Sequence, residues 1–247
     1  MNVRVNLLAI FVLSICSNYA LAQFDTVINL PENLGSPNPS GFSGNSTGND
    51  NGISSNTLLN VSDGGLIGLR FDAGAEDVPN TNVEVNISGG TVISGFNANS
   101  GSTVNISGGE VGSNFDAFAG STVNISGGTF GERFGANSGS TVNISGGEFD
   151  RFFHAESSSE VNISGGTVGS NFDAGSGSTV DISGGTFGSS FNARSGSTVN
   201  ISGGEFLLMA VQLMILPRLL PLVMEMFLLE RYKTARRLFF QLSVLTV

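Results

Sequence analysis

The chain repeats itself every 19 residues, and this period restricts its fold more than any other feature. The pentapeptide NISGG begins at Asn86 and recurs in the same phase through residue 204. Its further starting positions are Asn105, Asn124, Asn143, Asn162, Asp181 (as DISGG) and Asn200. A unit this short cannot bury an apolar core alone, so successive copies must stack on one another.

Each repeat has the residue pattern of short β-strands separated by tight turns. Residues 104–106 and 115–117 alternate apolar and polar side chains, and Gly108–Gly109 lies between them as a corner that needs free φ angles. The segments are too short for helices. We therefore expect an all-β, single-stranded parallel β-solenoid with one coil per 19 residues, and the crossover rule predicts a right-handed β-helix.

The strict period predicts that like residues form ladders along the solenoid axis. Val, Ile, Phe and Ala are expected to point inward in every coil. Each NIS triplet is formally a glycosylation acceptor, but sugars at one-coil spacing would crowd each other, so we interpret the Asn column as a ladder of side-chain amides. The outward residue after each Gly pair is Thr or Glu, and no two Glu fall in adjacent coils, which avoids charge repulsion.

The N-terminal segments differ in composition from the repeat. Residues 1–22 contain Arg4, the apolar run 7–16 and Ala20-Leu21-Ala22, a pattern that predicts a signal peptide cleaved after Ala22 and a secreted or cell-surface protein. Lipoprotein processing at Cys16 is the alternative, and the bulky Ile15 disfavours it. Residues 23–59 are rich in Asn, Ser, Gly and Pro and are expected to form an irregular, partly mobile N-terminal cap before the β-solenoid repeats of 60–206.

Residues 207–247 have a composition unlike the rest of the chain. They contain no Gly, Asp or Asn, include twelve Leu, and carry five basic and two acidic side chains. Three interpretations remain open: a shift of reading frame in the gene, an amphipathic helix with Arg231, Lys233, Arg236 and Arg237 on one face, or a membrane anchor interrupted by Pro217 and Pro221. Any membrane contact is expected through this tail.

Together, the Asn-Ile-Ser-Gly-Gly and Phe-Asp/Asn-Ala repeats resemble those of secreted right-handed parallel β-helix proteins, the pectate-lyase-like and autotransporter-passenger superfamily of folds. The resemblance covers residues 60–206. It implies an adhesin, a surface-layer component or a polysaccharide lyase. Lyases of this group carry Asp clusters with Lys or Arg on one face, whereas residues 23–206 contain four Arg and no Lys.

The charge and the scarcity of catalytic residue types limit the function. A net charge of −10 argues against nucleic-acid binding. The candidates for a calcium site are Asp72, Asp116 and Asp173, which whole coils separate, and His154 is interpreted as a turn variant; we expect no catalytic residues and no other cofactor. The expected function is an exported, non-enzymatic structural or adhesive protein that contacts glycans, cell surfaces or matrix. The alternative is a polysaccharide-active, lyase-like enzyme.

Overall fold

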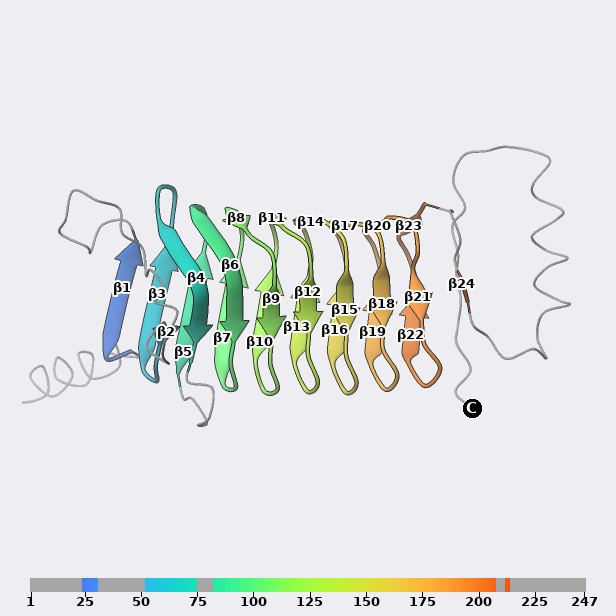
Figure 1. Cartoon of the computed structure of the whole chain (residues 1–247), viewed down its shortest axis with the longest axis horizontal. Helices are drawn as coiled ribbons and strands as arrows, with labels where there is room; N and C mark the ends of the chain where they lie inside the picture. Colours follow the sequence, from blue (N-terminus) through green and yellow to red (C-terminus); the bar gives the residue numbers. More distant parts are fainter. Residues whose placement is uncertain (1–23, 31–51, 75–81, 208–211, 214–247) are drawn as a thin grey trace, which may run out of the picture.

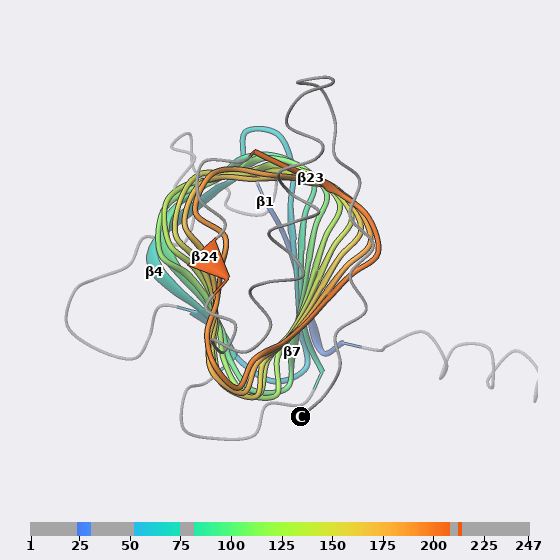
Figure 2. The ribbon, with the colours of Figure 1, turned by 90° about the vertical axis from the view of Figure 1, so that its right-hand side faces the viewer.

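A computed structural model describes residues 24–30, 52–74, 82–207 and 212–213. In this part of the chain the strands stack side by side along one long axis (Figure 1). Seen along that axis, successive coils superimpose (Figure 2). All strand pairs are parallel, so the expected all-β parallel β-solenoid is confirmed. Within the described ranges no helix is long and apolar enough to span a membrane.

One side of the solenoid is a 9-stranded sheet in which each coil contributes its Thr-Val-Asn-Ile segment or the equivalent. Its strands are β1 (Thr26–Leu30), β3 (Thr57–Val61), β5 (Val83–Ile87), β7 (Ser102–Ile106), β10 (Thr122–Ile125), β13 (Thr141–Ile144), β16 (Glu160–Ile163), β19 (Thr179–Ile182) and β22 (Thr198–Ile201).

The rest of each coil belongs to a 15-stranded sheet with two rows of short strands. The long strands β4 (Leu66–Ala73) and β6 (Thr91–Ala98) extend through both rows. The row that follows the Gly pairs contains β8 (Glu110–Val111), β11 (Thr129–Phe130), β14 (Glu148–Phe149), β17 (Thr167–Val168), β20 (Thr186–Phe187) and β23 (Glu205–Phe206). The Phe-x-Ala row contains β2 (Gly52–Ile53), β9 (Phe115–Ala117), β12 (Phe134–Ala136), β15 (Phe153–Ala155), β18 (Phe172–Ala174), β21 (Asn192–Ala193) and β24 (Gln212–Leu213).

The ladders of like residues fill the interior as expected. The Phe of each Phe-x-Ala segment stacks on its neighbours from Phe96 to Phe191, with ring centroids 4.8–5.0 Å apart and planes within 13° of parallel. A second aromatic column meets the first edge-on, as Phe149 does with Phe134 at 5.4 Å. These rings are buried, and their contact area stabilises the stack of coils.

The two glycines of each NISGG motif are required for different reasons. The second adopts the left-handed conformation, as at Gly109 with φ 88°. The first does not, but a Cβ at Gly108 would lie 2.6 Å from the backbone oxygen of Ser88 in the preceding coil. The free φ predicted for the pair therefore holds for the second glycine, while the first allows the coils to approach each other closely.

A buried serine ladder closes each coil, and the sequence analysis did not anticipate it. Each of these serines donates its hydroxyl to the backbone oxygen three residues earlier at 2.6–2.7 Å. The members are the buried Ser102, Ser121, Ser140, Ser159 and Ser178, and Ser197 of the last coil, which is partly exposed. Because this bond satisfies the hydroxyl inside its own turn, a polar residue is tolerated next to the apolar core.

The solenoid begins earlier than the expected boundary at residue 60. Where an irregular cap is expected, β1 pairs with β3 in register, from Thr26 with Thr57 to Leu30 with Val61. At the other end, Gln212 and Leu213 of the tail pair with Asn192 and Ala193 as the short strand β24, whereas the helix considered after Pro221 lies outside the described residues. In both places the open edge of a parallel sheet offers backbone hydrogen bonds. The signal peptide, residues 31–51 of the cap and the rest of the tail lie outside the described residues.

Candidate functional site

A groove, which we call the asparagine groove, runs along the solenoid where the strands of the 9-stranded sheet end. It is lined by the Asn-Ile-Ser segments of seven consecutive coils, from 86–88 to 200–202, with Asp181 in place of one Asn. Its volume is about 1010 Å³. The 19-residue register places like side chains at the same point of each coil, so the groove presents the same chemistry in six of its seven coils.

The expected ladder of Asn side chains forms one wall of this groove. From Asn86 to Asn162, the Nδ2 group of each Asn donates to Oδ1 of the Asn in the preceding coil, for example Asn124 to Asn105 and Asn143 to Asn124, both at 2.9 Å. A side-chain amide has two N–H donors, and the ladder uses one of them. At Asn105 and Asn162 a further contact reaches Glu84 and Glu160, at 3.3 and 3.2 Å.

The exposed serines of the NIS triplets also line the groove. Ser145 donates its hydroxyl to the backbone oxygen of Ile125 at 3.3 Å, and Ser164 makes the same contact with Ile144. The isoleucine between Asn and Ser in these triplets is almost fully buried. In six of its seven coils the groove therefore offers a repeating pair of neutral polar groups, an amide and a hydroxyl.

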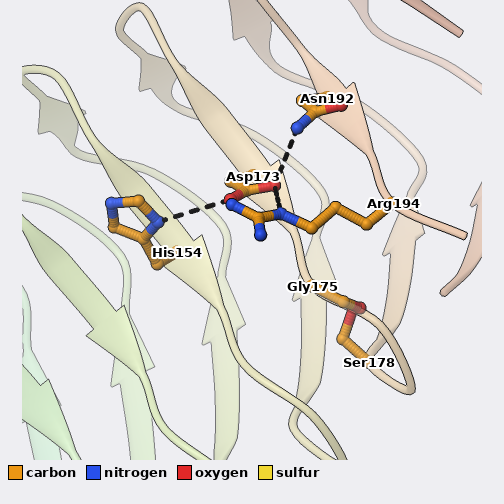
Figure 3. Close-up of polar contacts among 6 residues, drawn as sticks. All are labelled: His154, Asp173, Gly175, Ser178, Asn192 and Arg194. Atoms are coloured by element: carbon orange, nitrogen blue, oxygen red, sulfur yellow. Dashed lines mark hydrogen bonds and ion pairs between the residues drawn. The ribbon is translucent and has the colours of Figure 1, made fainter. Parts of the chain in front are cut away.

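A second hollow lies on the Phe-x-Ala row of the last three coils, and we call its polar side chains the His154 cluster. Asp173 is at the centre, with His154 and Asn192 on the flanking strands β15 and β21 (Figure 3). Asp173 Oδ1 accepts from Asn192 Nδ2 at 3.1 Å and from Arg194 Nε at 2.9 Å, while His154 Nδ1 lies 3.7 Å from Asp173 Oδ2. The hollow has a volume of about 580 Å³ and is also lined by Phe152, Asn171, Ser190 and Ser195.

The acidic residue of the cluster is mostly buried, whereas its basic residues are more exposed. The Asp173 side chain is 13% exposed, whereas those of His154 and Arg194 are 38% and 60% exposed. Hydrogen bonding to Asp173 and its negative charge raise the pKa of the Arg194 guanidinium above its usual value. Asp173 is therefore fixed in place by hydrogen bonds from Asn192 and Arg194, and the side chains of Arg194 and His154 remain accessible to solvent.

The three predicted calcium candidates lie in one column but do not come together. Between Asp72 and Asp116 lies Asn97, and between Asp116 and Asp173 lie Gly135 and His154. Each carboxylate already accepts a hydrogen bond from a side-chain amide: Asp72 from Asn97, Asp116 from Asn137, and Asp173 from Asn192. Among the described residues there is no group of three or more His, Cys, Asp or Glu placed to hold a metal ion.

The structure also places His154 next to an ion pair between Asp173 and Arg194, which the sequence analysis did not predict. His154 does occupy the outward column of Asp116 and Asp173, as the repeat phase requires. The missed feature is Arg194, which reaches back across one coil to Asp173. A sequence signal existed, because Arg194 is one of only four Arg in residues 23–206 and lies 21 residues after Asp173, close to one coil length.

The fold defines this chain as a parallel β-solenoid repeat protein. Comparisons with protein-family models, with curated proteins and with solved structures find no match for it. Its own geometry and chemistry are therefore the basis for a functional proposal.

Proposed function

We propose that this chain is an exported, non-enzymatic structural or adhesive protein that binds extended polymers, such as glycan chains, along the asparagine groove. The observation that carries the proposal is the uniform lining of the groove through seven coils. A polymer with a regular repeat can make the same contact many times on such a surface. Many weak contacts in series give strong attachment without any single tight site.

The chemistry of the groove favours neutral, hydroxyl-rich polymers over charged ones. Amides and hydroxyls can both donate to and accept from sugar hydroxyl groups. The net charge of −10 disfavours approach of a polyanion. Export rests on the pattern of residues 1–22.

Binding to insoluble neutral polysaccharides, measured by co-sedimentation, tests the proposal. Ser145 is exposed and lines the groove, so Ser145→Tyr should obstruct it and reduce the bound fraction. Ser138→Tyr is the matched control, because Ser138 is an exposed turn residue nearby that does not line the groove. Equal binding by the two variants, or no binding by the unaltered chain, would contradict the proposal.

The second candidate function is a polysaccharide lyase that uses the His154 cluster. The proximity of His154, Asp173 and Arg194 in one hollow favours it, since a lyase needs a base and a cationic group. Incubation with acidic polysaccharides should then release unsaturated products, detected by their ultraviolet absorbance. Their absence would leave the non-enzymatic proposal.

A further inference from the structure

We propose that the His154 cluster is a binding site for a neutral saccharide unit. It lies on the Phe-x-Ala row, whereas the asparagine groove lies at the end of the 9-stranded sheet. The two surfaces share no lining residue, so this proposal does not depend on polymer binding in the groove.

The cluster carries two residue types, His154 and Arg194, that no other described coil has at the same positions. Other coils place Asn, Asp or Gly at the position of His154, and Asn, Phe, Glu or Gly at the position of Arg194. Those coils form the same strands with the same register. The fold therefore requires neither His154 nor Arg194, although both line one hollow (Figure 3).

Phe152 adds a second and independent observation. It occupies a column in which the backbone is left-handed, and its φ is 67°. The other coils have Gly, Asn, Arg or Ser in this column, at Arg70, Gly95, Asn114, Arg133, Asn171 and Ser190, so the conformation belongs to the repeat, and Gly and Asn adopt it with the least strain. Phe152 is the one aromatic residue in this column among the described coils, so the repeat does not require its ring. Phe152 is half-buried, lines the hollow, and has the Arg151 guanidinium 5.4 Å from its ring centroid.

The charges and polar groups of the hollow match a neutral ligand rich in hydroxyl groups. Asp173 and Arg194 form an ion pair and cancel each other's charge, so this pair leaves no net charge to select an anion. A sugar hydroxyl both donates and accepts, and the hollow offers an accepting carboxylate next to donating amide, guanidinium and imidazole groups. Phe152 adds apolar surface for the C–H face of a sugar ring. The volume of about 580 Å³ suits a small oligosaccharide.

The test is titration of the whole chain with cellohexaose, xylohexaose and maltohexaose as neutral probes and hexagalacturonate as the acidic one. Isothermal calorimetry should show binding of at least one neutral probe and weaker binding of the acidic probe. His154→Asn and Arg194→Asn place residues that other coils carry at these positions, so the coils should still form. Each should weaken binding by about tenfold or more. Ser138→Tyr, a change at an exposed turn residue that lines neither the groove nor the hollow, should leave this affinity unchanged.

Phe152→Asn and Arg133→Asn form a matched pair. Both residues lie in the left-handed column, at φ 67° and 65°, so both substitutions should raise the thermal midpoint. Only Phe152 lines the hollow, so only Phe152→Asn should also lose affinity. The proposal is overturned if no neutral probe binds at millimolar concentration, if the His154, Arg194 and Phe152 variants bind as well as the unaltered chain, or if hexagalacturonate binds more tightly. Release of unsaturated products from hexagalacturonate would overturn it in favour of a lyase.

Discussion

Asp181 interrupts the asparagine ladder at its contact with Asn162. The two residues are partners in the pairing of β16 with β19. Asp181 Oδ1 accepts from Asn200 Nδ2 at 2.6 Å, and on the other side Asn162 donates to Asn143 at 3.0 Å. An ionised carboxylate has no N–H, so it cannot donate to the Oδ1 of Asn162. Oxygen therefore faces oxygen at this one step.

Asp181→Asn should repair the ladder and stabilise the solenoid. The substitution restores the donor and adds one hydrogen bond, worth about 0.5–1.5 kcal/mol. Chemical denaturation followed by circular dichroism measures the change. The reverse substitution, Asn143→Asp, is the control and should cost a similar amount, because it creates a second interruption. A lower stability for Asp181→Asn would show that the carboxylate has another role.

Removing one ring from the phenylalanine stack should destabilise several coils at once. Phe134 is 3% exposed and lies between Phe115 and Phe153, with ring centroids 4.9 and 4.8 Å away. Phe134→Ala removes contacts to both neighbouring coils and should cost about 3–5 kcal/mol in the free energy of unfolding. Phe118→Ala is the matched control, since Phe118 is 38% exposed and its loss should change stability by about 0.5 kcal/mol or less. Similar effects of the two changes would contradict the assigned core.

Close approach between coils should make the first glycine of each pair intolerant of a side chain. A Cβ at Gly146 would lie 2.2 Å from the backbone oxygen of Ser126, which cannot move without separating the coils. Gly146→Ala should therefore destabilise the protein by about 1–3 kcal/mol. At Gly135 the nearest atom is the Oδ1 of Asp116, at 2.4 Å, and that side chain can rotate away. Gly135→Ala should thus be nearly neutral in thermal denaturation, and equal losses at the two sites would refute the distinction.

The sequence was sufficient to predict the ladders because the 19-residue period leaves one register. Val123 pairs with Val104 and Val142, and Phe134 with Phe115 and Phe153, as the repeat phase requires. The ends could not be predicted in the same way. Residues 26–30 join the ladder through backbone hydrogen bonds to the next strand, which many sequences can make.

The candidate site was less predictable than the fold because it depends on a long side chain of one coil that contacts a residue of the preceding coil. Periodicity places His154 and Asp173 in one column, but it gives no information on where a long side chain such as Arg194 extends. The bond from Arg194 to Asp173 depends on rotamers and on the curvature of the turn after Ala193. The left-handed backbone at Phe152 is not signalled by phenylalanine itself, but Gly95, Asn114 and Asn171 at the same position of other repeats do signal it.

Burial of Asp116 should make stability depend on pH in a defined direction. Desolvation by burial raises the pKa of this carboxyl above 3.8, although the bond from Asn137 and the charge of Arg133 oppose the shift. The native state therefore binds the proton more tightly than the unfolded state. The resulting stabilisation is complete below the unfolded pKa and is lost as pH rises through the higher folded pKa.

Asp116→Asn should consequently raise stability at neutral pH, because the cost of a partly buried charge disappears. The column accepts this residue type, as Asn97 and Asn192 show, and an Asn oxygen can still accept from Asn137. Thermal midpoints measured from pH 7 down to below 3.8 should show the advantage of the variant shrinking as the native carboxyl is protonated. Glu110→Gln, an exposed change in the same coil, controls for the loss of one negative charge from a chain of net charge −10. If Asp116→Asn is less stable than the unaltered chain at pH 7 and the difference vanishes in acid, the ionised carboxylate is stabilising and the direction argued for Asp116 is wrong.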